Sequence, residues 1–294
     1  MLRSRQMSRP FTILGAQMRP VAFDPAATLD KFEAEVRRFN AAVPGADLLL
    51  FPEAYLAAED PFADGGRDGY AGEVAEEIPG PLTDRVGGIA ASVKRWIAAG
   101  SVVERAGGRL YNTALVFDPH GTLVARYRKL FPWAPFEEEA PGDALCAFDV
   151  PGVGRLGIMI CYDGWFPEVS RGLALAGAEV LLHPTLTTTA DRAEELILAR
   201  ANAIANQCYV LNVNAAPTIG GGRSIGVDPE GRVLFELGGN EEFVIQEVDL
   251  DRVTRVRAGG TRGLNRVLHH LRHAPPAVFE PYRRLLDGAD DDAG

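Results

Sequence analysis

A continuous apolar run that stops at a cysteine is the feature that most constrains how this chain can fold. Every residue from Ile158 to Ile160 is apolar, which predicts a central strand buried on both faces, and Cys161 follows it directly. Pro167 then stands where a first helical turn tolerates proline, ahead of a predicted helix over 168–176. Open α/β sheets bind ligands at the carboxyl ends of such strands, so Cys161 is a candidate site residue. The alternative is a small cysteine of the core.

The composition is that of an ordinary globular protein, and it argues against two classes of partner. The 294 residues, 47% of them hydrophobic and 24% charged, suffice for a sizeable core. A net charge of −10 leaves no basic surplus to neutralise phosphates, so we expect no nucleic acid partner. No apolar run approaches the roughly 18 residues of a membrane span, and the basic N-terminus lacks the apolar core of a secretory signal. We therefore expect no membrane association.

The cysteines indicate a reducing compartment rather than a disulfide framework. Cys146, Cys161 and Cys208 are scattered and odd in number, and no pair has CxxC spacing. No HExxH sequence occurs, so we expect neither a structural zinc site nor a zincin site. The sequence therefore predicts a soluble cytoplasmic α/β protein without a metal.

The pattern of strands and helices predicts a single domain over 11–255, because no linker divides the chain and no short repeat is visible. We expect an extension over 1–10, and an arm with an acidic tail over 256–294 that packs on the body or on a second subunit. An irregular loop over 58–80 is expected to frame a pocket. Strands are predicted at 11–17, 47–51, 97–104, 111–118, 123–127, 156–160, 180–184 and 209–214, with a terminal antiparallel set at 224–228, 233–236 and 243–249. Helices are predicted at 24–40, 82–94, 168–176 and 191–206, the last with a capping box of Asp191 and Glu194.

A second predicted strand ends on a charged residue. The strand over 47–51 leads into Pro52-Glu53 in the same manner as 158–160 leads into Cys161. We therefore expect Glu53 and Cys161 to face one crevice above the sheet. A carboxylate partly desolvated at a strand end has its pKa raised toward neutrality, which suits it to take a thiol proton. Taken alone, a glutamate in this position is more often a solvated surface charge.

Lys129 is the candidate for stabilising the oxyanion that attack on a carbonyl develops. It precedes a stiff loop over 130–136 that holds three aromatic residues and two prolines. A lysine flanked by apolar loop residues is costly to bury without such a role. Taken alone, it too is read as a solvated surface charge.

Other motif interpretations fail on their context. The glycines of 152–157 match GxGxxG, but they run into a strand instead of following one and opening a helix. No GxSxG occurs, which counts against a serine hydrolase. Among the five histidines, only His183 ends a predicted strand near the candidate site, and such a histidine is more often structural than a general base.

Taken together, three segments resemble the nitrilase, or carbon-nitrogen hydrolase, superfamily. They are Phe51-Pro52-Glu53, Tyr127-Arg128-Lys129 and the sequence CYDGWFPE over 161–168. The resemblance extends over nearly the whole chain and implies an αββα four-layer sandwich. It also implies subunits that pair to extend the sandwich, as a homodimer or a higher even homo-oligomer. The implied catalytic triad is Glu53, Lys129 and Cys161, which hydrolyses a carbon-nitrogen bond without a cofactor.

The segment 128–137 is similar to the corresponding loop of aliphatic amidases and formamidases. In those enzymes a second glutamate, here Glu137, lies beside the triad and helps orient substrate and lysine; the residues from Glu138 on depart from that branch. Carbamoylases that bind carboxylate-bearing substrates tend to carry arginine shortly after the cysteine, where this chain has Asp163, Gly164 and Trp165. The resemblance therefore favours a small uncharged carboxamide, hydrolysed to acid and ammonia through a cysteine thioester.

Five further residues are predicted to contact the substrate. Tyr55, Trp133 and Trp165 are expected as apolar walls, or else as plain core residues; Tyr162 would offer its backbone N–H to the oxyanion, and His183 ends a strand nearby. Two rival functions stay open. One is an N-carbamoyl amidohydrolase with the same triad, and the other is an inert member that serves as a binding or assembly subunit.

Overall fold

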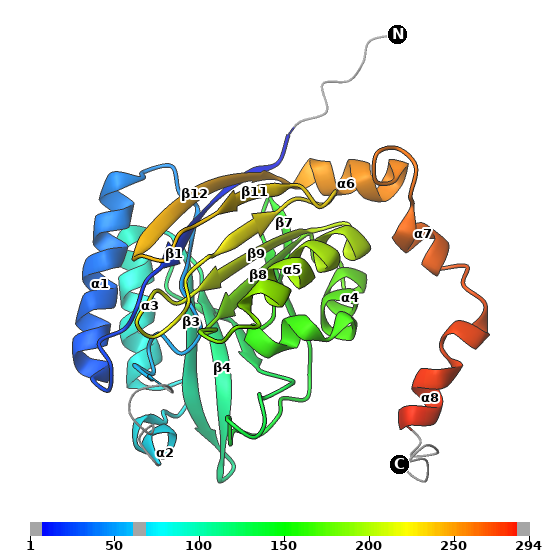
Figure 1. Ribbon diagram of the computed structural model, residues 1–294. Coiled ribbons are helices and arrows are strands. Elements are labelled where there is room, and N and C mark those ends of the chain that lie inside the picture. The colour runs from blue at the N-terminus through cyan, green and yellow to red at the C-terminus, as the bar shows by residue number, and fades with distance from the viewer. Residues whose placement is uncertain (1–7, 61–68, 287–294) are drawn as a thin grey trace.

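Two six-stranded sheets pack face to face in the computed structural model, which describes residues 8–60 and 69–286 (Figure 1). The first sheet has the strand order β12-β1-β2-β3-β4-β5 and the second the order β11-β10-β9-β8-β7-β6. The strands of the first sheet are β1 (Pro10–Gln17), β2 (Leu48–Leu50), β3 (Trp96–Ala106), β4 (Arg109–Phe117), β5 (Leu123–Arg128) and β12 (Glu242–Asp249). Those of the second are β6 (Cys146–Val150), β7 (Gly154–Ile158), β8 (Val180–Thr185), β9 (Tyr209–Asn214), β10 (Ile225–Val227) and β11 (Val233–Glu236).

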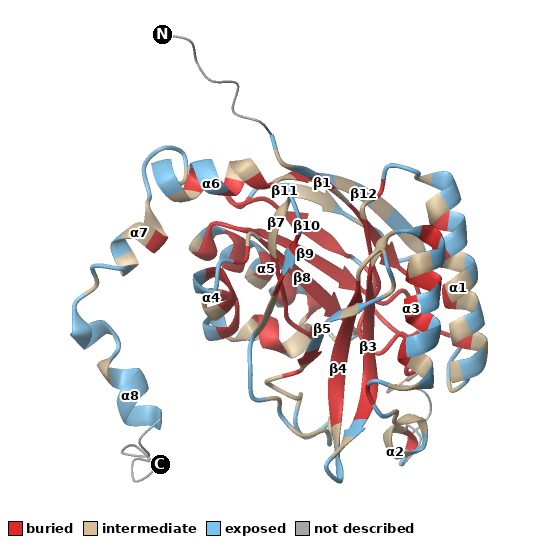
Figure 2. Ribbon diagram, turned by 180° about the vertical axis from the view of Figure 1, so that it is seen from behind, coloured by how far each residue is buried: buried red, intermediate tan, exposed pale blue. Residues whose placement is uncertain are grey.

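Helices cover the outer face of each sheet, which makes four layers in the order αββα and confirms the expected sandwich. The helices α1 (Pro25–Ala42) and α3 (Pro81–Val93) lie on the first sheet, and α4 (Pro167–Leu175) and α5 (Arg192–Asn206) lie on the second. Figure 2 shows the central strands of both sheets buried almost throughout, whereas α1, α3, α4 and α5 are buried only in part. No helix in the described ranges has both the length and the apolar content to span a membrane.

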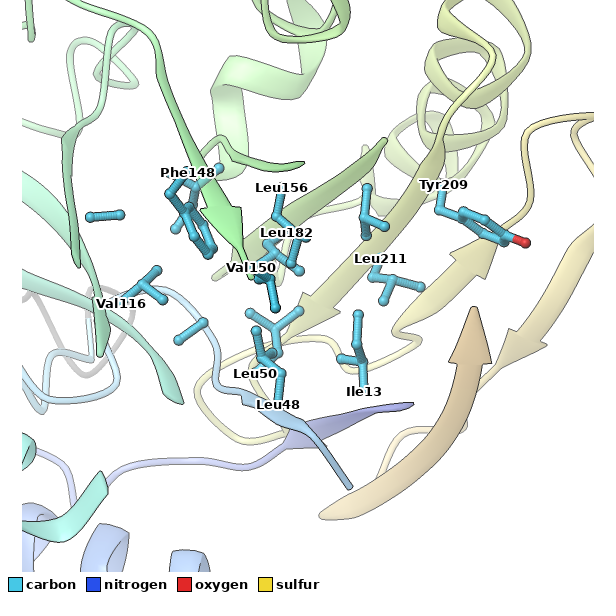
Figure 3. Packing of buried hydrophobic residues seen from close by; sticks show 14 of the residues in the cluster. Ile13, Leu48, Leu50, Val116, Phe148, Val150, Leu156, Leu182, Tyr209 and Leu211 are labelled. Atoms are coloured by element: carbon cyan, nitrogen blue, oxygen red, sulfur yellow. The ribbon is translucent and has the colours of Figure 1, made fainter. Parts of the chain in front are cut away.

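The alternation of side chains along β1 and β2 explains why a sheet can be buried on both faces. Successive strand residues point to opposite faces. Ile13, Leu48 and Leu50 accordingly pack between the sheets (Figure 3), and Leu14 and Leu49 pack beneath α1 and α3. Strands buried in this way read as continuous apolar runs, which predicts β2. The strand β7 ends at Ile158, two residues before the end expected for it.

Several predicted elements need correction. The strand β12 does not join β10 and β11 in one antiparallel set; it pairs with β1 at the edge of the first sheet. Asp191 precedes α5 but makes no capping hydrogen bond, because its carboxylate accepts from the Thr189 hydroxyl. The segment expected as an irregular loop over 58–80 contains a short helix, α2 (Tyr70–Val74). Residues 61–68 of that segment lie outside the described residues, as do 1–7 and the acidic 287–294.

The C-terminal arm begins as a helix that packs on the body. This helix, α6 (Leu250–Gly259), crosses the boundary expected at residue 255 and buries Val253 and Val256. The short helices α7 (Val267–Leu271) and α8 (Glu280–Leu286) then lead away from the sheets along one side of the molecule (Figure 1). The Tyr282 hydroxyl donates to Glu168 of α4 at 2.9 Å.

Candidate active site

The turn after β2 carries Glu53 and is held in place by β3. The Ala54 backbone N–H donates to Ser101 Oγ at 2.8 Å. Gly100 has φ +76°, and a Cβ at that position would lie 1.8 Å from the Pro52 carbonyl oxygen. Only glycine therefore permits β3 to approach the turn so closely. A register shift in β3 at this point reflects the approach.

The ammonium of Lys129, directly after β5, joins two carboxylates. Nζ donates to Glu53 Oε1 at 2.9 Å and to Glu137 Oε1 at 2.6 Å. The side chains of Lys129 and Glu53 are only 1% and 3% exposed. Asn112 of β4 adds a second donor to the same Glu53 oxygen, at 2.9 Å from Nδ2, and its backbone carbonyl accepts from the Lys129 N–H. The triangle of Glu53, Lys129 and Glu137 is thus fixed by β4 and β5.

Burial and charge set the protonation states of this group. Burial by itself would lower the pKa of Lys129, but the charges of Glu53 and Glu137 outweigh it and hold that pKa well above its ordinary value. Burial raises the pKa of Glu53, against the opposing charge of Lys129. Burial, reinforced by the charge of Glu53, raises the pKa of the Cys161 thiol well above its ordinary value. The resting site therefore holds a charged lysine and a neutral thiol.

Cys161 begins a 3₁₀ turn (Cys161–Trp165) that follows β7, and it has φ +42°, a left-handed conformation that non-glycine residues rarely adopt. Asp163 ties the turn to the rest of the site. Its carboxylate accepts from the Ile160 N–H at 2.9 Å, the Phe131 N–H at 3.0 Å and the Tyr127 hydroxyl at 2.8 Å. The turn is therefore fastened to β5 and to the loop that follows Lys129.

A cavity of about 130 Å³ opens beside these groups. Glu53, Glu137 and Cys161 all line it. The two strand ends meet at one crevice as expected, but they come from different sheets and not from one. The remaining lining residues are Ala54, Ala57, Glu59, Ser101, Val102, Val103, Asn112, Trp133, Phe136, Glu139 and Leu186. No group of His, Cys, Asp and Glu in the described ranges is arranged to hold a metal ion.

The predicted substrate contacts fall into three positions. Trp133 lines the main cavity, and Tyr162 and Trp165 line a smaller one that shares Cys161 and Trp133 with it. Tyr55 does not line either cavity; it is fully buried among Phe32 and Phe51 in the core beneath α1. Its assignment as a pocket wall was wrong, because its ring points into the layer between sheet and helix.

His183 likewise lies outside both cavities. It is 2% exposed and sits below the cysteine turn, with Nε2 at 2.8 Å from the Cys161 carbonyl oxygen. Burial lowers the pKa of His183, so its ring is neutral. The placement corrects its assignment as a substrate contact.

Sequence reasoning missed four residues near the reacting groups. Asn112, Glu59 and Glu139 line the main cavity, and the Thr187 hydroxyl lies 3.6 Å from Cys161 Sγ. For Asn112 a signal existed, since an amide within an apolar strand stands out. For the others none did, because polar residues in loops are unremarkable.

Comparisons with known proteins agree with this geometry. A family model described as carbon-nitrogen hydrolase matches residues 15–258. The omega-amidase NIT2 of Homo sapiens is 34% identical over 234 residues, which cover 74% of this chain and 82% of the relative. The solved structure of Saccharomyces cerevisiae Nit3, a member of branch 10 of the nitrilase superfamily, superposes with a TM-score of 0.76 at 26% identity, covering 87% of this chain and 96% of Nit3.

An amidase of the nitrilase superfamily from Nesterenkonia sp. AN1 is also similar. The structure of its cysteine-to-alanine mutant in complex with butyramide superposes with a TM-score of 0.73 at 26% identity, covering 90% of this chain and 100% of its own. Another structure of that amidase shows covalent addition of the acetamide moiety of fluoroacetamide at its active site cysteine, with a TM-score of 0.73 and 26% identity over 88% of this chain and 98% of its own. The chain described here therefore belongs to the carbon-nitrogen hydrolase family of the nitrilase superfamily and is an enzyme of the amidase type.

Proposed function

We propose that this enzyme hydrolyses a small carboxamide without a carboxylate group to a carboxylic acid and ammonia, with Cys161 as the nucleophile. The observation that carries the proposal is that Cys161 and Glu53 line one cavity, with the buried Lys129 ammonium 2.9 Å from Glu53 Oε1. A buried base beside a thiol, with a fixed cation next to both, meets the requirements of acyl transfer through cysteine.

In the first half of the reaction, Cys161 Sγ attacks the amide carbon while its proton passes to Glu53. The raised pKa of Glu53 suits it to receive that proton, because a base works best when its pKa lies near the working pH. Lys129 Nζ and the Tyr162 backbone N–H hold the oxyanion. Glu53 then gives the proton to the leaving nitrogen, the carbon-nitrogen bond breaks, and ammonia departs from a thioester.

In the second half, Glu53 takes a proton from a water molecule, whose oxygen attacks the thioester carbon. Collapse of this second tetrahedral intermediate breaks the carbon-sulfur bond, and the proton returns to sulfur. The products are a carboxylic acid and the free thiol. Glu137 orients Lys129 throughout by its 2.6 Å hydrogen bond.

The charges around the cavity support an amide that lacks a carboxylate. Besides Glu53 and Glu137, the lining includes Glu59 and Glu139, and none of the described lining residues is lysine or arginine. Burial and the neighbouring charge of Glu139 raise the pKa of Glu59 to about 7. An anionic N-carbamoyl amino acid would meet carboxyl groups and no cation among the described residues that line this cavity. The butyramide complex of the similar amidase supports the same choice.

The test is ammonia release from butyramide and other short aliphatic amides, from N-carbamoyl-β-alanine and from butyronitrile. We expect release from the amides, and its loss in Cys161→Ala with the fold retained by circular dichroism. Release from the carbamoyl compound alone would favour a carbamoylase with the same three residues. An unreactive Cys161 and silence toward every compound would favour the inert binding subunit.

The proposal extends to assembly and location. We propose an even homo-oligomer built by pairing of sandwiches, supported by the outward-facing apolar side chains of Leu175 and Ile197 on α4 and α5, which are 59% and 67% exposed. Light scattering gives its mass. We propose a cytoplasmic location, supported by three free cysteines.

A further inference from the structure

We propose that His183 is a positioning residue that aims the oxyanion-binding N–H of Tyr162 by holding the carbonyl of Cys161. The inference rests on the proposed function, since it concerns the donor that the proposed mechanism uses. It concerns a residue that contacts neither cavity and acts through the backbone alone.

Hydrogen bonds connect Arg192 to Asn212, Asn212 to His183, and His183 to the Cys161 carbonyl. The donor and the acceptor of each bond can be assigned by starting at Arg192. Arg192 carries only donors, and its Nη2 lies 2.7 Å from Asn212 Oδ1. The amide of Asn212 must therefore present its NH₂ to His183, where Nδ2 lies 2.9 Å from Nδ1. His183 Nδ1 is thus the acceptor, and the single proton of the neutral ring is on Nε2. That proton is donated to the Cys161 carbonyl oxygen at 2.8 Å.

The acceptor carbonyl and the proposed oxyanion donor belong to one peptide group. The carbonyl of Cys161 and the N–H of Tyr162 share a plane and point in opposite directions. A hydrogen bond that fixes the carbonyl therefore also fixes the direction of the N–H. It polarises the peptide as well, which strengthens the N–H as a donor.

The backbone at this point needs such a restraint. Cys161 is in the left-handed region, at φ +42°, which the surrounding structure must hold. Asp163 restrains the peptide on the other side of Cys161, because its backbone N–H donates to the Ile160 carbonyl oxygen at 2.9 Å. His183 supplies the restraint on the Cys161–Tyr162 peptide, and the His183 ring also packs against Gly164, where an added Cβ would lie 2.5 Å from Cε1. Asn212 and Arg192 are 0% and 4% exposed, so the chain of contacts is shielded from water.

Two amide substitutions at residue 183 separate donation from packing. In His183→Gln the terminal NH₂ can reach the place of Nε2, whereas the shorter His183→Asn reaches only the place of Nδ1. We expect His183→Asn to lower kcat for butyramide about 10- to 100-fold with little change in KM, because it weakens a transition-state donor. We expect His183→Gln to retain most of the wild-type kcat.

A second reaction at the same sulfur shows whether the loss is specific to the oxyanion. Methyl methanethiosulfonate modifies Cys161 by displacement at sulfur and builds no oxyanion on carbon, so its rate at Cys161, followed by peptide mass spectrometry, should stay near the wild-type value in His183→Asn. A parallel fall in this rate would mean a general collapse of the turn and would overturn the proposal. So would wild-type kcat in His183→Asn, or an equal loss in His183→Gln.

Butyraldehyde gives a readout that does not need amide turnover. The thiol adds to the aldehyde carbon and its proton goes to the oxygen, giving a thiohemiacetal whose oxygen occupies the oxyanion position. We expect its inhibition of Cys161 labelling to weaken about tenfold or more in His183→Asn and to persist in His183→Gln. If wild type releases no ammonia from amides yet shows this difference, the proposed function fails and the role of His183 stands. Equal inhibition in all three proteins would overturn that role.

Discussion

Glu137 accepts a hydrogen bond from the Trp133 backbone N–H at 2.7 Å through Oε2, while its Oε1 accepts from Lys129 at 2.6 Å. The Glu137 carboxylate thus links the backbone of the loop after β5 to the Lys129 ammonium. Because Trp133 also lines the cavity, the shape of the substrate pocket and the position of the proposed oxyanion cation depend on the same side chain.

Glu137→Gln should therefore impair turnover without unfolding the protein. The amide keeps one acceptor for two donors, so either Lys129 or Trp133 loses its partner. We expect kcat/KM for butyramide to fall about 10- to 100-fold, a loss typical of a group that supports transition-state charge. Glu138→Gln, one residue along the loop, is the matched control. Equal activity in both variants would contradict the role given to Glu137.

Lys129→Met should destabilise the fold. The substitution leaves the carboxylates of Glu53 and Glu137 without their cation, and breaking a buried pair costs about 3 kcal/mol or more. Urea denaturation at pH 7 measures the loss, with the exposed Lys94→Met as control. Burial raises the pKa of Glu53 in the fold, so this carboxylate takes up a proton as the pH falls and its unpaired charge is removed. The difference in free energy of unfolding between Lys129→Met and wild type should therefore decrease as the pH falls. A gap that widens in acid would refute this account.

Glu59→Gln should stabilise the protein at alkaline pH. The pKa of Glu59 is about 7 in the fold, against an ordinary value of 4.5. The folded state therefore binds the proton more tightly than the unfolded state. Protonated Glu59 therefore contributes to the free energy of unfolding of the wild type. This contribution is fully present below pH 4.5, decreases as the pH rises and has been lost above pH 7.

The Gln variant has no such decline. We expect its free energy of unfolding to exceed that of wild type by about 3 kcal/mol at pH 8 and to match it near pH 4.5. Glu77→Gln, at an exposed glutamate, is the control. A constant offset between Glu59→Gln and wild type across this range would exclude ionisation as the cause.

Gly164→Ala should disturb the cysteine turn. Its Cβ would lie 2.5 Å from His183 Cε1, so the imidazole or the turn must shift. We expect a stability loss of about 1 to 3 kcal/mol, as in overpacked cores, together with reduced turnover. Gly72→Ala in α2, where an added Cβ meets nothing within 4 Å, is the control and should retain both. Thermal unfolding and butyramide assays would show whether the two differ.

The ends of the two strands that carry the site were predictable from local sequence. The proposed catalytic residues Glu53, Lys129 and Cys161 were predictable as well. Apolar runs that stop at Glu53 and Cys161 predict buried strands, and the motifs around Lys129 add the cation. That the two strands lie in different sheets and meet at one cavity was not predictable from these runs. These signals are local, or are shared with a known family. They therefore do not depend on knowing which strands are neighbours.

Features that depend on distant pairing were not predictable in this way. The partner of β12 is β1, at the opposite end of the chain, and an alternating strand pattern fits either sheet equally well. The role of His183 depends on the register of β8 against β9, which places Asn212 opposite it. Tyr55 was misassigned because an aromatic residue after a strand end can turn either toward a cavity or into the core.

The pairing of β1 with β12 has a consequence for how the protein is made. Pro10 faces Asp249 and Gln17 faces Glu242, so β1 acquires its outer neighbour only after β2 to β11 have been synthesised. Until then β1 presents a row of unsatisfied backbone groups to other nascent chains. A product that stops short of residue 242 would therefore keep the backbone N–H and C=O groups along this edge of β1 unpaired.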